Sequence, residues 1–365
     1  MRQLQKIRGE ILSLIGKDYS HDDVLPPYRS LAAQFHTSIN TIYRALCSLQ
    51  EAGYVQISRS KGTVVIKKPF ESSDPHSAGF ILHNAPHAED TATLSLITGM
   101  ESVFQKNNID LSLNFSYRVR ESEIRLIDSL YAKNIRNIIV YPSNDPLDEK
   151  YLNFLTEKKK SGMNIVLIDK YFSGNHFSCA VMDGLWGIFG VCSALYQTGE
   201  KYFVYTVMPD PPVSIIEREL GFDLFISRTK AESEKITFPS RFFDNPLTCT
   251  DLPEYARLAE LIKKKHTVIV CPHDGVAAAA GKYLMSRNFS IPEDVRITGF
   301  GNLPLLKDLP FPVSTCGVDF HLLGLSAAEL LVRHIHEPGA PAQRIVVQSP
   351  VMLNFKKHTG EPHVR

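Results

Sequence analysis

Residues 37–66 read TSINTIYRALCSLQEAGYVQISRSKGTVVI, and this stretch decides the fold of the first part of the chain. A threonine and a serine at its start can each cap a helix, because their hydroxyls accept a backbone N–H bond. Apolar residues follow at helical spacing from Ile42 to Leu49, and Gly53 is typical of a helix end. YVQIS and TVVIK then alternate in strand fashion around RSKG, which predicts a hairpin.

Two more helices are predicted before this stretch. Residues 3–15 carry apolar side chains on one helical face, and RSLAAQFH, residues 29–36, fits a short helix with Leu31 and Phe35 inward. Two prolines separate these helices. Three helices followed by a hairpin form a winged helix-turn-helix, in which the third helix enters the DNA major groove.

LPPYRSLAAQFHTSINTIYRALCSLQEAGYVQISRSKGTVV, residues 25–65, resembles the GntR-type DNA-binding domain. It shares that family's L-P-x-x-R-x-L-A opening, the S-x-x-T-[VI] start of the third helix and the G-T-[FV]-V wing. The resemblance spans about residues 4–66 and implies DNA binding. At positions 39 and 43 the family commonly has arginine, whereas this chain has Ile39 and Tyr43, which favours a non-standard target sequence.

The predicted third helix turns a polar face outward when Ile42 points inward. Its N-terminal end favours a phosphate, its asparagine can read adenine, and its arginine can read guanine. For each basic residue a solvated surface charge is the alternative. The candidate DNA-contacting residues are Arg29, Ser38, Asn40, Thr41, Tyr43, Arg44, Arg59 and Lys61.

Charge supports this assignment. Residues 1–68 hold 10 Lys+Arg and 5 Asp+Glu, a net +5, while the rest holds 40 − 10 = 30 basic and 39 − 5 = 34 acidic residues, a net −4. A basic segment on a mildly acidic body is typical of a polyanion-binding module joined to another domain. The start lacks a signal-peptide pattern, and the six cysteines form no C-x-x-C pair, so we expect reduced thiols in a cytosolic protein without a membrane span.

From Gly79 onward, apolar strand-like runs alternate with helical runs, from GFILH to VRITGF at residues 295–300. This alternation predicts parallel sheets covered by helices on both faces, and the length favours two such sheets. We expect a winged-helix head at 1–68, a linker at 69–78, an effector domain at 79–355 and a tail at 356–365.

Several later stretches resemble the effector domain of LacI-type regulators, whose fold is that of periplasmic sugar-binding proteins. They include NIVLIDKYF at 164–172, IIERELGF at 215–222 and the run TVIVCPHDGVAAAAGKYLMSRNFSIPEDVRITGF at 267–300. The resemblance implies two lobes that close over a ligand, with chain crossings near 182, 301 and 335. The expected lobes are 79–182 with 302–335, and 183–301 with 336–355.

Ligands of α/β sheets bind at the carboxyl ends of the strands, and a sugar needs paired donors and acceptors. The resemblance to LacI-type effector domains implies ligand positions at Asp169, Arg218 and Asp274. It also implies a hinge aromatic at Phe320. Helix capping is the alternative for the two aspartates, an interlobe salt bridge for Arg218, and core packing for Phe320 and Trp186. The candidate effector-binding residues are His83, Asn84, Tyr141, Asp169, Arg218, Asp244, Asp274, Asn302 and Phe320.

The chain carries no P-loop, G-x-S-x-G, H-E-x-x-H or G-x-G-x-x-G motif. We therefore expect no catalytic residues, no cofactor and no bound metal. The predicted function is that of a homodimeric transcription regulator, a repressor, that binds palindromic operator DNA and a small polar effector, with a monosaccharide as the leading candidate. A solute-binding transport protein and a sugar-processing enzyme with a DNA-binding appendage stay open as alternatives.

Overall fold

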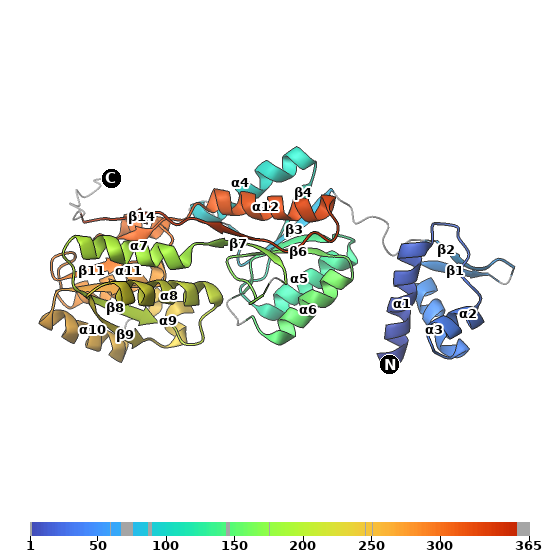
Figure 1. Ribbon diagram of the computed structural model, residues 1–365, viewed down its shortest axis with the longest axis horizontal. Coiled ribbons are helices and arrows are strands. Elements are labelled where there is room, and N and C mark those ends of the chain that lie inside the picture. The colour runs from blue at the N-terminus through green and yellow to red at the C-terminus, as the bar shows by residue number, and fades with distance from the viewer. Residues whose placement is uncertain are drawn as a thin grey trace. The chain divides into compact units, whose positions relative to one another are not determined.

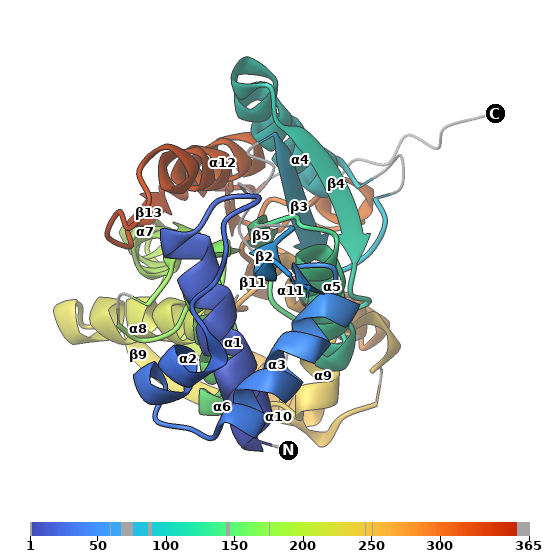
Figure 2. The same cartoon turned by 90° about the vertical axis from the view of Figure 1, so that its right-hand side faces the viewer.

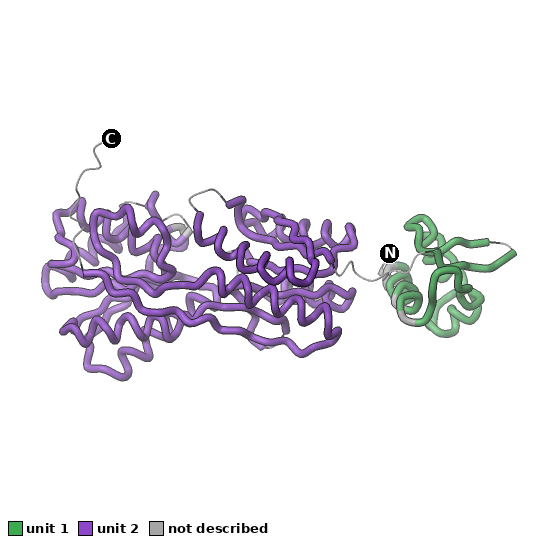
Figure 3. Tube along the Cα trace, turned by 90° about the horizontal axis from the view of Figure 1, so that it is seen from above, with its two compact units in different colours: residues 1–74 green, residues 75–365 purple. Residues whose placement is uncertain are grey.

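The computed structural model describes most of the chain, in ranges separated by short gaps. Contacts divide the chain into two compact units, residues 1–74 and 75–365 (Figure 3). Within the described part, no helix is long and apolar enough to span a membrane. The described residues are 2–58, 60–66, 76–86, 90–143, 147–174, 176–244, 246–249 and 251–355.

The first unit is a three-helix domain with a hairpin, as the sequence predicts. Its elements are α1 (Arg2–Asp18), α2 (Tyr28–Gln34), α3 (Ile39–Glu51), β1 (Val55–Ser58) and β2 (Gly62–Val65).

The head is held together by the inward faces of these helices. Ile11 of α1, Leu31 of α2 and Ile42, Leu46 of α3 are fully buried in one hydrophobic cluster. After α3, Gly53 has a φ of 77°, a left-handed conformation that glycine adopts without steric cost. Strands β1 and β2 pair in antiparallel register. Val24, in the segment between α1 and α2, forms an antiparallel bridge with Val64 of β2.

The second unit contains two parallel sheets flanked by helices (Figure 1). The six-stranded sheet has the order β13-β7-β6-β5-β3-β4, and helices α4 and α12 lie side by side on one of its faces while α5 and α6 cover the other (Figures 1 and 2). The elements are β3 (Ser77–Leu82), α4 (Thr91–Phe104), η1 (Gln105–Asn107), β4 (Asp110–Phe115), α5 (Arg120–Ala132), β5 (Asn137–Val140), α6 (Glu149–Lys160), β6 (Asn164–Ile168), β7 (Ser178–Met182), α12 (Phe320–His336) and β13 (Arg344–Val347).

The four-stranded sheet of the second lobe has the order β11-β10-β8-β9. Helices α7 and α8 pack on one face of it, and α10 and α11 pack on the other. The elements are α7 (Gly184–Gln197), β8 (Tyr202–Val207), α8 (Val213–Arg228), β9 (Glu232–Thr237), α9 (Ser240–Asp244), η2 (Pro246–Thr248), α10 (Pro253–Lys264), β10 (Thr267–Val270), α11 (Asp274–Ser286), β11 (Val295–Thr298), η3 (Pro304–Asp308), β12 (Thr315–Cys316) and β14 (Val351–Met352).

Two of the expected lobe boundaries are wrong. We assigned 302–335 to the first lobe, but Phe311 belongs to the core of the second lobe, and Ser314 bridges to Thr298 of β11. The second crossing therefore lies just before α12, not near 301. We assigned 336–355 to the second lobe, but β13 pairs with β7 in the first-lobe sheet. The third crossing consequently follows β13, because the chain returns only at β14, which pairs with β12.

The boundary between linker and effector domain also differs from the expectation. β3 begins at Ser77, inside the segment 69–78 that we assigned to the linker, since Ser77 pairs in parallel with Asp110 of β4. Residues 67–75 of the expected linker and the tail 356–365 lie outside the described residues.

Candidate functional site

The N-terminal end of α3 is built by its capping serine. Ser38 Oγ accepts a hydrogen bond from the Thr41 backbone N–H (3.1 Å) and lies 2.8 Å from Thr41 Oγ1. This pairing fixes where the helix begins and satisfies one of the N–H groups that a helix start leaves open. Ser38 and Thr41 thus have a local structural role, in addition to the phosphate contact proposed for them.

The outward face of α3 carries two parallel stripes. Asn40 and Arg44, four residues apart, are both exposed. Ile39 and Tyr43 are exposed beside them, at 47% and 48% of their surface. Side chains four residues apart lie one above the other on a helix, so each pair forms a stripe along the axis.

The remaining candidate DNA-contacting residues lie on other elements of the head unit. Arg29 is exposed in the first turn of α2, and Lys61 is exposed in the turn between β1 and β2. Both are available to phosphates, which cationic side chains contact without reading bases. Arg59, our other wing candidate, lies outside the described residues.

In the second unit, the strand orders locate the expected ligand edge of each lobe. In the first lobe, β4 lies on one side of β3 and β5 on the other, so the direction in which strands are added reverses between β3 and β5. In the second lobe, β9 and β10 lie on opposite sides of β8, so the same reversal occurs between β8 and β10. A parallel sheet opens a crevice at the carboxyl ends of its strands at such a reversal. His83 follows β3 and Tyr141 follows β5, whereas Pro272 and His273 follow β10.

His83 and Tyr141 form an aromatic pair at the first-lobe crevice. Their ring centroids are 4.6 Å apart. His83 Nε2 lies 2.9 Å from the carbonyl oxygen of Pro142, so Nε2 carries the proton that it donates. Burial, aided by the cations Lys170 and Arg118, lowers the pKa of His83 to about 4. His83 is therefore neutral at pH 7, with the Nδ1 lone pair as an acceptor.

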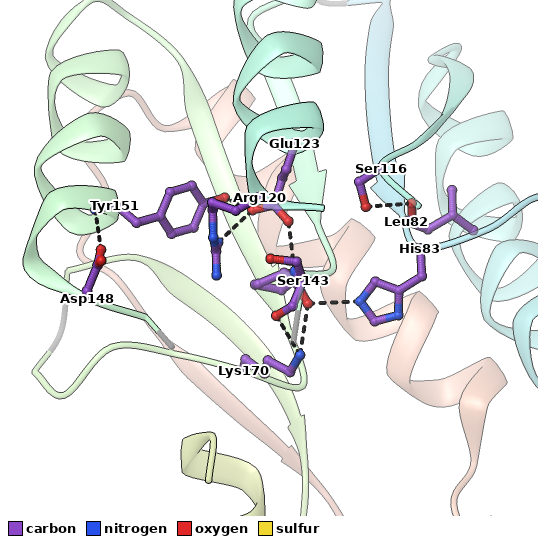
Figure 4. Close-up of polar contacts among 10 residues, drawn as sticks. Leu82, His83, Ser116, Arg120, Glu123, Ser143, Asp148, Tyr151 and Lys170 are labelled. Carbon is purple, nitrogen blue, oxygen red and sulfur yellow. Dashed lines mark hydrogen bonds and ion pairs between the residues drawn. The ribbon is translucent and has the colours of Figure 1, made fainter. Parts of the chain in front are cut away.

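A buried lysine that the sequence reading missed fixes the loop after β5. Lys170 Nζ donates to the carbonyl oxygens of Pro142 (3.0 Å) and Ser143 (2.7 Å), as Figure 4 shows for Ser143. Burial lowers the pKa of Lys170 to about 8, although neighbouring Asp169 opposes this shift. Its only sequence signal is its place directly after Asp169 at the end of β6.

A buried glutamate holds the same loop from α5. Glu123 is fully buried; its Oε2 accepts the Ser143 backbone N–H (2.8 Å) and its Oε1 accepts from Arg120 (2.9 Å) and from the Tyr151 hydroxyl (Figure 4). Burial raises the pKa of Glu123, and Arg120 counters that effect. A charged residue within an ordinary helix gives no sequence signal for such a role.

Asp169 and Arg218 meet across the lobes. Asp169 follows β6 of the first lobe in a left-handed conformation (φ 65°), and Arg218 belongs to α8 of the second lobe. Arg218 donates to the Pro272 carbonyl (2.8 Å), and its guanidinium lies 4.0 Å from the centre of the Phe300 ring. The closest contact between Arg218 Nη2 and Asp169 Oδ1 is 4.0 Å.

Both side chains of this pair keep unused hydrogen-bonding capacity. Asp169 is 7% exposed and Arg218 is 6% exposed. Among the described residues, Asp169 Oδ1 and Arg218 Nε have no hydrogen-bond partner, although both atoms are buried. Unpaired polar atoms in such a place are costly and call for an occupant. The interlobe salt bridge that we left open for Arg218 thus exists only as a long contact, with room for further partners.

Asp274 differs from both interpretations that we gave it. It is fully buried, and its carboxylate accepts hydrogen bonds from Leu303 N (2.7 Å) and Thr315 Oγ1 (2.7 Å). It does not cap α11, because His273 is the N-cap residue. Burial raises the pKa of Asp274. Its role in the structure is to tie the start of α11 to the segments that follow β11.

The other candidates fall at separate places. Asn302 and Phe320 line an open pocket of 510 Å³ together with Thr91 and Met352. Asn84 is exposed directly after His83. The side chain of Asp244 lies outside what the structure describes.

Thr91 places this pocket at the start of α4. Asp90, which caps α4 beside Thr91, is one of the charges that raise the pKa of Tyr141. Trp186, for which we left core packing or ligand stacking open, is 59% exposed and packs edge-on against Phe189.

Arg118 is a further residue that the sequence reading missed. It and Tyr117 both have positive φ values, 61° and 55°, which are strained for residues with a side chain. The charge of exposed Arg118 lowers the pKa of His83 in the first lobe and also that of His273 in the second. Arg118 therefore acts on both crevices.

We call His83, Tyr141, Asp169, Lys170 and Arg218 the interlobe cluster. It combines an aromatic pair, a carboxylate and two cations, which can hold a polar ring through donors, acceptors and an apolar face. The structure brings four of the nine predicted effector residues into this cluster: His83, Tyr141, Asp169 and Arg218.

Comparison with known proteins gives the same two-part organisation. Residues 5–65 match the bacterial regulatory proteins of the gntR family, and residues 193–354 match a periplasmic binding protein-like domain. The arabinose metabolism transcriptional repressor of Geobacillus stearothermophilus is 20% identical over 352 residues, covering 95% of both chains. Catabolite control protein A of Priestia megaterium is 21% identical over 265 residues, covering 72% of this chain and 76% of the relative.

A solved structure shows the fold of the second unit. The periplasmic binding protein/LacI transcriptional regulator from Alkaliphilus metalliredigens, complexed with D-xylulofuranose, superposes with a TM-score of 0.63 at 18% identity. The match covers 77% of this chain and 98% of that one. The chain thus joins a segment that matches the gntR family of bacterial regulatory proteins to a segment that matches a periplasmic binding protein-like domain.

Proposed function

We propose that this protein is a transcriptional repressor that binds operator DNA through its head and is controlled by a small sugar held between the lobes of its second unit. One observation carries this proposal: a basic head with an exposed, capped third helix is joined to a two-lobed unit in which Asp169 and Arg218, from different lobes, keep unpaired buried polar atoms. The relatives named above are regulators by their names, two of them concerned with sugar metabolism or catabolite control.

Asp169 and Arg218 are the central ligand residues in this proposal. An arginine offers a fork of donors and an aspartate accepts from two hydroxyls, so together they suit the neighbouring hydroxyls of a monosaccharide. The His83–Tyr141 pair supplies an apolar surface for the C–H face of the ring. Of the other predicted ligand residues, we retain Asn84, Asn302 and Phe320 as contacts at the edge of the site.

Control of DNA binding requires that the ligand favour one arrangement of the lobes. A sugar that draws Arg218 toward Asp169 stabilises the closed lobes, and a homodimer then presents its two heads with a different spacing. The ligand acts only through its differential affinity for the two arrangements. A coupling of about 1–3 kcal/mol changes operator affinity by about 5- to 150-fold.

A thermal-shift screen of monosaccharides and sugar phosphates tests the effector. A ligand at about 100 times its dissociation constant stabilises its domain by about 2.7 kcal/mol. We expect one small group of sugars to raise the melting temperature and to shift operator affinity in a gel-shift titration. Turnover of the stabilising sugar would instead favour a sugar-processing enzyme.

The assignment of DNA binding to the head is tested by a fragment of residues 75–365, which form a compact unit by themselves. We expect this fragment to bind the sugar and to leave operator DNA unshifted. Operator affinity retained by the fragment would contradict the assignment.

A further inference from the structure

Two large apolar side chains are exposed on the helix that we propose to enter DNA. Ile39 is 47% exposed and Tyr43 is 48% exposed, whereas Ile42, Leu46 and Leu49 of the same helix are fully buried. Ile39 and Tyr43 are four residues apart and therefore lie on one side of α3. The helix thus has an apolar stripe that takes no part in the head core.

The stripe is held in place by its surroundings. Ser38 caps α3 directly before Ile39, so Ile39 occupies the first helical turn, the end that reaches base edges in helix-turn-helix proteins. The Tyr43 ring lies against the Tyr28 ring of α2, with centroids 6.0 Å apart and planes at 56°. Tyr28 is itself half-buried, so it supports the ring of Tyr43 from the neighbouring helix.

A polar stripe runs directly beside the apolar one. Asn40 and Arg44 are exposed, each one residue further along the chain than Ile39 and Tyr43. A surface with hydrogen-bonding groups next to apolar groups complements a partner that presents acceptors next to methyl groups. The DNA major groove has this composition, because thymine places its C5-methyl group beside the acceptors of adjacent bases.

We propose that Ile39 and Tyr43 read thymine methyl groups in the major groove, while Asn40 and Arg44 read neighbouring base edges. This inference rests on the proposed DNA-binding function of the head. A protein partner for the same stripe is disfavoured by the net charge of +5 on residues 1–68, calculated from ten basic and five acidic residues. That excess suits a polyanion.

The apolar chemistry of the stripe predicts which base it prefers. An isoleucine side chain forms no hydrogen bond with a base, so it gains only from apolar contact, and among the four DNA bases only thymine offers a methyl group there. Burying one methyl-sized group is worth about fourfold in affinity. Tyr43 adds its ring surface, and Tyr28 is a positioning residue that acts through Tyr43.

The experiment uses the full-length protein and begins by finding a DNA sequence that it binds. Duplexes are first selected from a random library. Each thymine of the selected duplex is then replaced in turn by deoxyuridine, which removes the methyl group and leaves the base pairing unchanged. We expect about fourfold weaker binding at one or more positions. In Ile39→Ala, uracil at the position that Ile39 reads should have no effect.

Arg29→Ala is the matched control, because a lost phosphate contact weakens binding equally to thymine and uracil duplexes. A second variant pair, Tyr43→Phe and Tyr43→Ala, separates the ring from its hydroxyl, and only the alanine variant should lose methyl dependence. The three substituted side chains are exposed, and the melting temperature of each variant shows whether the head remains folded.

Each outcome decides the proposal. A selected duplex that binds equally well with uracil at every position overturns the methyl readout alone. Methyl dependence that persists in both Ile39→Ala and Tyr43→Ala assigns the contact to other residues and also overturns it. Failure of the library to yield any enriched duplex would contradict the proposed DNA-binding function itself, and the inference with it.

Discussion

The two candidate sites of this protein are built in opposite ways. The proposed DNA-reading face takes Asn40 and Arg44 from a single helix, and both side chains are exposed. The interlobe cluster takes Asp169 and Arg218 from two lobes, and both are nearly buried. A site on one helix is set by helical spacing, whereas a site between lobes depends on how separate parts of the fold come together. Substitutions in the buried interlobe cluster should therefore change ligand affinity or folding stability, whereas substitutions on the exposed helix should change DNA affinity or base discrimination.

The largest effect is expected at the interlobe cluster. Arg218→Ala should weaken sugar binding at least tenfold, because it leaves the buried Asp169 carboxylate and the ligand hydroxyls without a charged donor, at about 2–4 kcal/mol. Operator binding by the ligand-free protein should stay nearly unchanged, since the head is a separate unit. Calorimetry with the identified sugar, beside a gel-shift titration, measures both. Unchanged sugar affinity would leave Arg218 as an interlobe support.

The two buried aspartates should separate binding from stability. Asp274→Ala leaves Leu303 N and the Thr315 hydroxyl without their acceptor and should lower the free energy of unfolding by about 1–3 kcal/mol. Asp169→Asn should instead weaken sugar binding with little loss of stability, because Asp169 Oδ1 has no hydrogen-bond partner among the described residues. Denaturant unfolding and calorimetry on both variants distinguish them. Equal stability losses would refute the contrast.

These aspartates also show where the sequence reading succeeded and failed. Strand ends nominated Asp169 and Asp274 alike, because each directly follows or nearly follows a strand. In the structure, both carboxylate oxygens of Asp274 accept hydrogen bonds, from residues 303 and 315. The sequence could not show this, because these partners belong to the second lobe only if the chain crosses between the lobes after residue 315. The two misplaced lobe boundaries have the same origin: β13 joins the first-lobe sheet through pairing with β7, a long-range contact without a local pattern.

By contrast, the head was accessible to sequence reasoning almost throughout. The cap at Ser38, the buried face of α3 and the end near Gly53 all follow from local rules. Lys170 and Glu123 were missed for the opposite reason. Both hold the loop after β5 by hydrogen bonds to its backbone atoms, and these partners are distant in sequence, so local patterns do not identify them.

The next effect concerns pH and arises at His83 of the interlobe cluster. The pKa of His83 is lowered to about 4 in the folded protein, against about 6.5 in an unfolded chain. The unfolded state therefore binds the proton first as pH falls from 6.5 to 4, and stability is lost across that window. At pH 5 this loss amounts to about 2 kcal/mol.

His83→Gln keeps a donor for the Pro142 carbonyl and removes the titrating group. We expect this variant to lose less stability than the wild type between pH 7 and pH 5 in urea unfolding. His36 is exposed in the head, and His36→Gln is the control for removing a histidine outside the interlobe cluster. Identical profiles for His83→Gln and wild type would contradict the role of His83.

The last effects are expected on the head, where substitutions should distinguish base contacts from phosphate contacts. Arg44→Ala should relax discrimination at particular base pairs, by about 1–3 kcal/mol if the side chain reads guanine. Arg29→Ala should weaken binding to all sequences alike, because Arg29 lies on α2 and not on α3, and we propose that it contacts a phosphate. Losing one phosphate contact lowers the slope of log affinity against log salt by about one unit.

Salt titrations with the selected duplex and with random DNA, for both variants, measure this division. In Arg29→Ala the slope should fall on both duplexes, and the ratio of the two affinities should stay constant. In Arg44→Ala the ratio itself should shrink. Equal losses on specific and random DNA for Arg44→Ala would make it a backbone contact, and the base-reading face of α3 would then depend on Asn40 and the apolar stripe. Base reading would then be assigned to other residues of α3. The contrast between a surface formed by one helix and a site formed by two lobes would remain.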